Sequence, residues 1–428
     1  MDMVLAKEPR VERDLETEPV KLILEGSILR ADGTSLGADN AVGLCHMMAL
    51  MEPSGLRHPP LELLFTVEEE TGLTGIRRAD LSRIRSRRML NMDCGDPDCV
   101  VIGAAGGSQY SIRGEFPLSS GDDPGSCGLC VEITGLRGGH SGIEAGKNRA
   151  SSLELAGRLL SALCGRLPVR LGRIDSPPPA NSFPRRVRLV LSLPAWGLDE
   201  AEQILSQTDL AFRTEMAGIE PDYRMTVTGC QAPPAASAAD TRALSDFLLL
   251  VPCGALRRSA DHPSWVLCSA LLSRASYEDG IFSGRFSVRA NRDAYRDAAA
   301  QRLMALCRMT GLRAELRTEP SPAWVEKEDS PLRDLCLSLY RELFGEEMRV
   351  QVDNGSVEVS VITSAIPDMD AIGFAPKSRG AHTTDEHLYL ETMPVFWSLL
   401  TALLSRLCDR PDDCPEPTHP QQKRESSV

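Results

Sequence analysis

The sequence lacks any apolar run that approaches the length of a membrane-spanning helix, and its start, MDMVLAKEPR, does not have the pattern of a signal peptide. Basic residues are also in the minority, with 47 Lys and Arg against 60 Asp and Glu and a net charge of −13. An excess of negative charge argues against general binding to nucleic acids or to anionic membranes. We therefore expect neither as a partner.

Cysteine is present, but not in the pattern of a disulfide framework. The 13 cysteines are odd in number and scattered, which fits a reducing compartment and predicts a cytoplasmic protein. Two pairs, Cys94 with Cys99 and Cys127 with Cys130, loosely imitate a four-thiolate zinc site. The first pair has four intervening residues, so we interpret these cysteines as free thiols rather than as metal ligands.

Several catalytic motifs are absent as well. The sequence contains no Walker motif and no His-Glu-x-x-His, and IGAAGG at 102–107 lacks the spacing of a dinucleotide-binding fingerprint. GTSLG at 33–37 does match the Gly-x-Ser-x-Gly nucleophile elbow, which makes a serine hydrolase using Ser35 and His382 an alternative hypothesis. Against it, the expected helix begins only after Asp39, too late for a tight elbow.

The apolar pattern predicts an α/β fold. In the first hundred residues, apolar runs typical of strands alternate with a helical pattern, which favours a mostly parallel sheet. LELLFTV, with its near-continuous apolarity, is expected to be a strand buried on both faces. The expected strands of this part are 20–31, 61–67, 88–93 and 100–107, and the expected helix is 41–51.

A change of pattern divides the chain. A loop rich in Gly, Pro, Ser and Asp, PLSSGDDPGSCG at 117–128, is followed by alternating segments typical of an inserted α+β domain. Helices are expected near 150–165, 199–217, 292–310, 331–344 and 391–407, and a strand at 368–374. We predict a discontinuous catalytic domain at 1–108 and 319–408, an inserted lid and dimerisation domain at 109–318, and a disordered tail at 409–428.

Acidic residues gather where the early strands end. Asp39, the cluster Glu68–Glu70 in FTVEEETG and Asp93 follow different strands, and His382 follows the expected strand 368–374. Loops at the carboxyl ends of parallel strands open into one crevice. Carboxylates and an imidazole in one crevice are ligands that zinc, manganese or cobalt accept. One carboxylate can bridge two metal ions about 3.5–4 Å apart, while another serves as a base.

These residues lie in motifs that resemble a known family. The motifs, in chain order, are GTSLGADNAVG, FTVEEETGLTG, NMDCGD, IGAAGG, GLRGGHSG and GAHTTDE, supported by NSFPR and FLLLVPCGALRRSADHPSWV. Together they resemble peptidase D, the aminoacyl-histidine or cytosol non-specific dipeptidase branch of the dinuclear-zinc metallopeptidases, over about residues 1–407. The resemblance implies hydrolysis of unblocked dipeptides, Xaa-His among them, by a homodimer with two zinc ions per chain, or manganese or cobalt.

The resemblance also implies roles for the acidic residues. Asp39 would bridge the two ions, Asp93 would bind one of them, and Glu70 with His382 would bind the other. Glu69 would be the general base that takes a proton from the attacking water. Such a base must lie within hydrogen-bond distance of the water and must not itself be a metal ligand. Glu68 is expected to be an acidic neighbour without a direct role.

Further roles are implied for the inserted domain. His140 would polarise the scissile carbonyl, often from the partner subunit. Arg289 and the turn at Asn354 and Ser356 would bind the terminal carboxylate of the substrate, a task that suits a guanidinium. An exposed arginine at a strand end is the alternative interpretation of Arg289.

The chain departs from the family in two places. NGSVEVS at 354–360 replaces a His-Ala-Gly-Leu-Glu-Cys-Gly run, which makes the substrate preference less secure than metal binding. The family carries a His-x-Asp-Met-Val motif, of which this chain has only MDMV. Asp2 is therefore present, whereas the ligand histidine that this aspartate would orient is missing. We expect the chain to be an incomplete copy of a working enzyme; a non-catalytic relative that binds peptides or dimerises is the other hypothesis.

Overall fold

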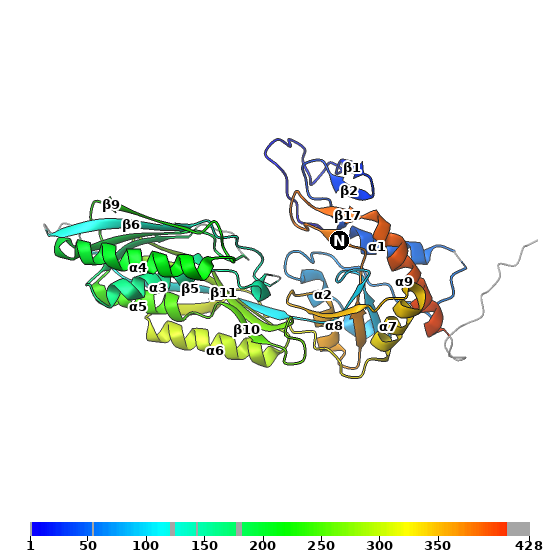
Figure 1. The fold of residues 1–428 in the computed structure, drawn as a ribbon. Coiled ribbons are helices and arrows are strands. Elements are labelled where there is room, and N and C mark those ends of the chain that lie inside the picture. The colour runs from blue at the N-terminus through cyan, green and yellow to red at the C-terminus, as the bar shows by residue number, and fades with distance from the viewer. Residues whose placement is uncertain (1, 54, 120–124, 143, 177–181, 409–428) are drawn as a thin grey trace, which may run out of the picture. The chain divides into compact units, whose positions relative to one another are not determined.

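The computed structural model describes residues 2–53, 55–119, 125–142, 144–176 and 182–408, so the predicted tail at 409–428 lies outside the described residues (Figure 1). The chain divides into two compact units, which we describe separately. Unit 1 comprises Met1–Ile102, Lys327–Gln351 and Ala365–Val428, and unit 2 comprises Gly103–Glu326 and Val352–Ser364. The domain boundaries expected from the sequence stay a prediction. None of the described helices is both long and apolar enough to cross a membrane.

Two four-stranded sheets form the framework of unit 1. In the first sheet the order is β1-β2-β17-β16, with β1 (Leu22–Glu25), β2 (Ile28–Ala31), β16 (Ser378–Arg379) and β17 (His387–Tyr389) in antiparallel pairs. In the second sheet the order is β14-β4-β15-β3, with β3 (Arg88–Asn91), β4 (Cys99–Ala104), β14 (Arg349–Asp353) and β15 (Asp370–Gly373). β15 pairs in parallel with β3 and in antiparallel orientation with β4.

Local signals in the sequence explain where the helices of unit 1 begin and end. In α7 (Pro331–Phe344), the Ser330 hydroxyl accepts the N–H of Arg333, Pro331 occupies the first turn, and Gly345 ends the helix with φ 74°. This helix packs against α9 (Met393–Leu407), whose inward face is fully buried. The remaining helical segments are α1 (Ala38–Met51), α2 (Thr74–Arg78) and the 3-10 turns η1 (Leu81–Arg83) and η4 (Leu390–Thr392).

Unit 2 contains a nine-stranded sheet. Its order is β13-β5-β12-β11-β7-β8-β6-β9, and β10 pairs separately with β11. The longest pair, β11 with β12, is joined at Asp279 and Gly280, which both have positive φ, as a tight hairpin turn of this Asp-Gly type requires. The strands are β5 (Gly106–Glu115), β6 (Ser126–Thr134), β7 (Arg170–Asp175), β8 (Val187–Pro194), β9 (Arg224–Cys230), β10 (Gly254–Arg258), β11 (Val266–Glu278), β12 (Ile281–Ala290) and β13 (Arg313–Leu316).

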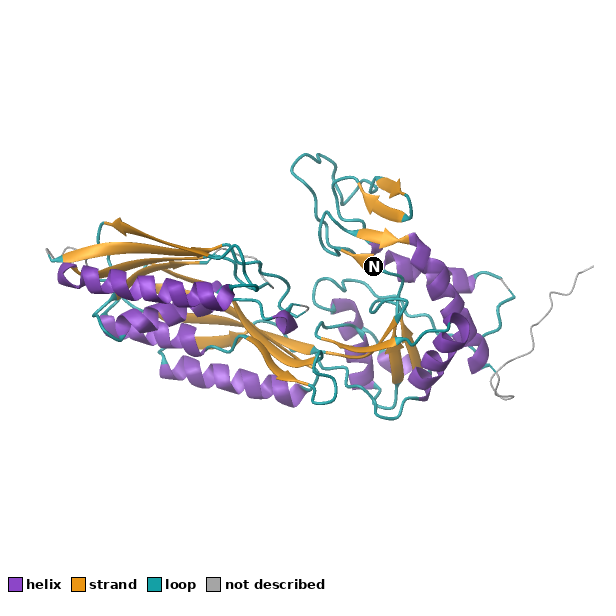
Figure 2. Cartoon of the chain, viewed as in Figure 1, coloured by secondary structure: helices purple, strands orange, loops and turns teal. Residues whose placement is uncertain are grey.

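Helices and this sheet enclose the large core of unit 2 (Figure 2). α3 (Ser152–Cys164) begins with a capping sequence in which the Ser151 hydroxyl accepts the N–H of Glu154, and it packs against α5 (Ala238–Leu250) and α4 (Leu198–Met216). α6 (Asp293–Met309) packs on β12 and β5. The other helical segments are α8 (Val359–Ala365), η2 (Ala145–Lys147) and η3 (Ala195–Gly197).

The expected α/β class is confirmed by this arrangement of sheets and helices. The expected mostly parallel sheet is not found among the described strand pairs of unit 1, where β15 with β3 is parallel and the pairs β1–β2, β2–β17, β16–β17 and β15–β4 are antiparallel. The expectation of a buried strand at 61–67 is wrong. No described strand pairs with this segment, and Leu64, Phe65 and Val67 are exposed. Apolar residues alone do not make a strand, because a strand also needs a neighbour for its backbone hydrogen bonds. The segment 20–31 forms a hairpin, β1–β2, because Gly26 with φ 62° turns the chain.

The first prediction concerns the core of unit 2. Leu160 on α3 is fully buried, whereas Leu210 on α4 is 67% exposed. We expect Leu160→Ala to lower the free energy of unfolding by about 2–5 kcal/mol, because the substitution removes apolar contacts and leaves a cavity. The matched control, Leu210→Ala, should change it by about 0.5 kcal/mol or less. Urea denaturation of the full chain measures both, and equal effects would contradict the assigned burial.

Candidate metal centre

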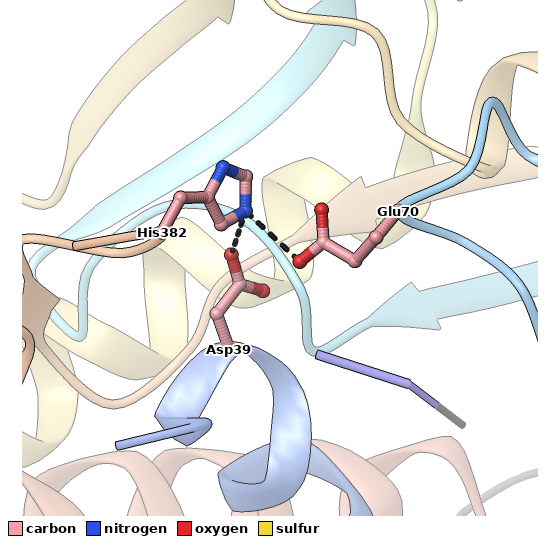
Figure 3. A group of neighbouring side chains, drawn as sticks. All are labelled: Asp39, Glu70 and His382. Atoms are coloured by element: carbon pink, nitrogen blue, oxygen red, sulfur yellow. Dashed lines mark ion pairs between the residues drawn. The ribbon is translucent and has the colours of Figure 1, made fainter. Parts of the chain in front are cut away.

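Three of the predicted ligands meet in unit 1. Nε2 of His382 lies 2.9 Å from Oε1 of Glu70 and 3.4 Å from Oδ2 of Asp39 (Figure 3). One ligand atom from each residue lies within 4.8 Å of the other two. The three residues come from the start of α1, from the turn before α2 and from the loop between β16 and β17. Two segments from the first hundred residues and one from near the end of the described chain therefore supply one cluster.

Asp39 is presented by an irregular start of α1. Gly37 has φ 76°, and Asp39 itself is not helical, with φ −84° and ψ 104°. The buried carboxylate of Glu386 accepts the backbone N–H groups of Leu36, Gly37 and Asp39 at 2.7, 2.8 and 3.2 Å. Glu386 is the last residue of the motif GAHTTDE, and no local pattern in the sequence indicates this role.

Glu70 and its neighbour Glu69 belong to a tight turn. Glu68 and Leu73 have positive φ, and the N–H of Leu73 donates to the carbonyl of Glu69 at 2.9 Å. The carboxylate of Asp2 holds this turn, because its two oxygens accept the N–H groups of Glu69 and Glu70 at 2.9 and 3.2 Å. Asp2 thus orients the backbone of two predicted site residues, a role that was not expected from the sequence.

His382 lies in the turn between β16 and β17 and has φ 68°, a conformation that a residue with a side chain rarely adopts. Such backbone strain persists where the surrounding structure enforces it, and it is common at functional sites. Arg379, just before the turn, forms a bidentate pair with Asp96 at 2.9 and 2.8 Å. Glu386 follows the turn, so His382 is held between two anchored ends.

The electrostatics of the cluster favour a cation. Hydrogen bonds to Asp39 and then to Glu70 raise the pKa of His382 to about 10, against an opposing effect of burial. Without a metal ion, the protonated imidazole offsets the repulsion between the two carboxylates. Ligand atoms around a tetrahedral zinc ion, at 2.0–2.1 Å from it, lie roughly 3.3 Å apart. The distances within the cluster, and its two oxygens and one nitrogen, fit a divalent cation.

Asp93 and Glu69 are the other predicted site residues of unit 1. Asp93 follows β3, where its N–H donates to Oδ1 of Asn91 at 3.0 Å, and it is not part of the three-residue cluster. Glu69 is partly buried and adjacent to Glu70 in the turn. The roles assigned to both residues stay predictions.

Ser35 does not have the environment of a nucleophile. It is fully buried, its hydroxyl donates to the carbonyl of Val4 at 2.7 Å, and it accepts the N–H of Ala6 at 3.1 Å. His382 pairs with Asp39 and Glu70 instead. An elbow serine must be exposed and next to a base, so this geometry argues against the serine hydrolase hypothesis.

The predicted substrate-binding residues lie in unit 2, and two of them flank the loop that carries His140. Nδ2 of Asn354 donates to the carbonyl of Gly142 at 3.1 Å and to the hydroxyl of Ser269 at 2.9 Å. Ser269 is the cross-strand partner of Arg289, and a Cβ added to Gly142 would lie 3.2 Å from Cδ of Arg289. Arg289 and Asn354 thus converge on the segment 140–142.

Two polar atoms in this neighbourhood have no hydrogen-bond partner. They are Nε of Arg289, a donor, and Oδ1 of Asn354, an acceptor, and both are inaccessible to solvent. Burial also lowers the pKa of the Arg289 guanidinium. Ser356 lies nearby, with its hydroxyl 3.3 Å from that of Ser321. A buried cation without a counter-charge is costly, so an anionic group would be favoured beside Arg289.

Comparisons with known proteins show the family of this chain and its similarity to dipeptidases. The family model described as Peptidase family M20/M25/M40 matches residues 1–406. The chain is 25% identical over 410 residues to the cytosol non-specific dipeptidase of Escherichia coli (strain K12), covering 95% of this chain and 84% of that protein. The structure matches aminoacylhistidine dipeptidase from Vibrio alginolyticus with a TM-score of 0.85, 25% identity and coverage of 95% and 82%. A tripeptidase from Staphylococcus aureus, with a TM-score of 0.50, 13% identity and coverage of 91% and 76%, shares the fold alone.

The second prediction concerns His382 in metal-free protein. Because the pKa is raised above its ordinary value of 6.5 to about 10, protonation should stabilise the fold fully below pH 6.5, and this contribution should be lost as pH rises toward 10. An NMR titration should find an imidazole that stays protonated well above pH 6.5. Asp39→Asn should lower this pKa, because it removes the carboxylate that contributes most. A His382 signal with an ordinary pKa in both proteins would contradict the cluster.

Proposed function

Because the chain belongs to peptidase family M20/M25/M40, we propose that it hydrolyses dipeptides with the help of a divalent cation. Membership of this family implies a divalent metal. The observation that carries the proposal is the convergence of Asp39, Glu70 and His382, in a chain that resembles a dipeptidase over 95% of its length. Two carboxylate oxygens and an imidazole nitrogen are a donor set that zinc accepts.

Zinc is the proposed metal, with manganese or cobalt as alternatives. Glu70 and His382 would hold one ion, Asp93 would hold a second, and Asp39 would be shared by both. When bound, the cation polarises the attacking water and the scissile carbonyl and so supplies the Lewis-acid chemistry of the reaction. Oδ2 of Asp39 lies 3.4 Å from Nε2 of His382, and this proximity to the other proposed ligands supports its proposed role as the shared ligand.

Glu69 is the proposed general base. A base must reach the attacking water without acting as a ligand itself. Glu69 directly precedes Glu70 in the turn, and Asp2 holds the N–H groups of both residues. This shared anchor supports a fixed spacing between the ligand and the base. Glu69 would take a proton from the water and pass it to the leaving amine.

Unit 2 is proposed to recognise the carboxylate terminus of the dipeptide. The unpaired Nε of Arg289 is a buried donor, and a substrate carboxylate would supply its missing partner. Asn354 and Ser356 would line the same subsite, and His140 would donate a hydrogen bond to the scissile carbonyl as negative charge develops there. The contact between Asn354 and Gly142 supports a subsite that includes the His140 loop.

The finer substrate preference is proposed from the relatives. The structurally similar protein from Vibrio alginolyticus is an aminoacylhistidine dipeptidase, and the relative from Escherichia coli is a non-specific dipeptidase. We propose that Xaa-His dipeptides are among the substrates. The homodimer and the cytoplasmic location stay predictions from the sequence.

The third prediction tests the base. Glu69→Gln should reduce kcat for an Xaa-His dipeptide by at least ~100-fold, because general-base catalysis contributes about 10²–10⁴-fold. The metal content should stay at the parental level, because Glu69 is not a proposed ligand. Turnover is measured by release of free histidine, and metal content by elemental analysis of the purified chain.

Two comparisons sharpen this test. Glu68→Gln, next to the proposed base, serves as the matched control and should leave turnover near the parental rate. His382→Ala should lose both metal and turnover, because it removes a ligand. Parental turnover in Glu69→Gln would show that another group is the base, and parental turnover after complete removal of metal would overturn the proposed function.

The fourth prediction tests the carboxylate subsite. Arg289→Gln should raise KM for dipeptides by roughly 10–100-fold, because a charged hydrogen bond contributes about 1.5–3 kcal/mol. The matched control is Arg285→Gln, on the same strand and the same side of it, where the pKa is also lowered by burial. Arg285→Gln should leave KM unchanged. Equal effects of the two substitutions would indicate a general loss of positive charge rather than a subsite.

A further inference from the structure

Glu386 has an unusual environment for a carboxylate. Its side chain is only 2% exposed, and none of the described Lys, Arg or His residues forms an ion pair with it. Its charge is instead satisfied by the three backbone N–H groups of Leu36, Gly37 and Asp39. A buried carboxylate costs several kcal/mol unless such hydrogen bonds compensate it, so its position is defined by these contacts.

These contacts connect two parts of the candidate metal centre. Glu386 is four residues beyond His382, and its partners are separated from it by 347 to 350 positions in the chain. One of the three donors is the N–H of Asp39 itself. The carboxylate of Asp39 lies 3.4 Å from the imidazole of His382. A single side chain thus ties the backbone of one proposed ligand to the loop that carries another.

The local backbone explains why a carboxylate is suited to this task. Gly37 adopts φ 76°, and Asp39 has not yet entered the helical conformation, so the N–H groups of this turn have no partners within α1. Successive backbone N–H groups in such a turn form a concave anion-binding site. Glu386 fills it with an anion that belongs to the chain. A neutral amide could accept at most through one oxygen and would also present N–H groups to these donors.

We propose that Glu386 is a positioning residue, which fixes the Asp39 backbone against the His382 loop and so preorganises the metal centre before a cation binds. This inference rests on the proposed function only in requiring that Asp39 and His382 bind a divalent cation. Partners that orient metal ligands typically contribute 10–100-fold to metal affinity. The pair between Arg379 and Asp96 holds the other end of the loop, so loss of Glu386 should loosen the centre without releasing the loop.

The experiment compares two buried carboxylates. Glu220 in unit 2 is 1% exposed and accepts the backbone N–H groups of Arg137 and Ala150 at 2.6 and 3.2 Å. It performs the same structural task away from the proposed ligands. Glu386→Gln and Glu220→Gln are each prepared in the full chain without metal. Urea denaturation then gives the stability of each variant, and competition with a chromogenic chelator gives the affinity for Zn²⁺.

We expect Glu386→Gln to bind Zn²⁺ about 10–100-fold more weakly than the parent. The Co²⁺-loaded variant should show a changed visible absorption spectrum, because the ligand geometry has changed. Glu220→Gln should lose stability and keep the parental affinity and spectrum. Glu386→Asp preserves the charge but shortens the side chain, so it should give an intermediate affinity, and it replaces Glu386→Gln in the comparison if that variant does not fold.

One outcome for Glu386→Gln, or for Glu386→Asp in its place, would overturn the proposal. The variant would lose stability as Glu220→Gln does, yet bind Zn²⁺ with the parental affinity and give the parental Co²⁺ spectrum. Glu386 would then have a structural role alone. A parental chain that binds neither Zn²⁺ nor Co²⁺ would overturn the proposed function together with this inference. A parent that binds the ions but shows no turnover would overturn the proposed hydrolysis and leave the positioning role supported by the affinities.

Discussion

Mutual repulsion between neighbouring carboxylates is the constraint on which the rest of unit 1 depends. Asp39 and Glu70 place their oxygens around one imidazole nitrogen of His382, and this arrangement is stable only with positive charge at its centre. In metal-free protein the proton on His382 supplies this charge, which is why its pKa is raised. A divalent cation would supply more charge at the same place, because the ligand atoms are already close together.

Backbone N–H groups, bound by two carboxylates, hold the turns that carry Asp39 and Glu70 in position. Asp2 binds the turn at Glu69 and Glu70, and Glu386 binds the turn before Asp39. Both carboxylates use donors that irregular turns leave without partners. Asp2 and Glu386 are themselves negatively charged, and their partners are backbone N–H groups rather than cations. Both side chains therefore add to the negative potential that would attract a metal ion.

Unit 2 has the opposite electrostatic requirement. Arg289 has a buried donor atom, Nε, without a partner, and the neighbouring Asn354 has a buried acceptor atom, Oδ1, without one. Unsatisfied buried groups lower stability, so their persistence is typical of positions at which a ligand completes the hydrogen bonding. Unit 1 therefore needs a cation and unit 2 needs an anion, and a peptide with a free carboxylate supplies the second requirement.

Features that depend on residues close together in the chain could be predicted from the sequence. The helix at 331–344 was predicted with its observed bounds, because Ser330, Pro331 and Gly345 act within one turn of their own position. Residue type and motif also predict Asp39, Glu70 and His382 as ligands, since the chemistry of a metal site restricts which side chains serve it, and the structure places these three side chains together. Asp93, proposed in the same way as a ligand of the other ion, stays a prediction.

Tertiary structure decided what depends on distant partners. Residues 61–67 have the composition of a buried strand, yet none of the described strands pairs with them, because pairing is a property of two segments and not of one. The contacts of Asp2 and Glu386 are equally absent from any local pattern, since their donors lie 67 and about 350 positions away. The sequence by itself therefore determined the fold class and the candidate ligands. Only the folded chain decided which carboxylates lie beside His382 and which ones bind the backbone next to them, because both depend on contacts between distant segments.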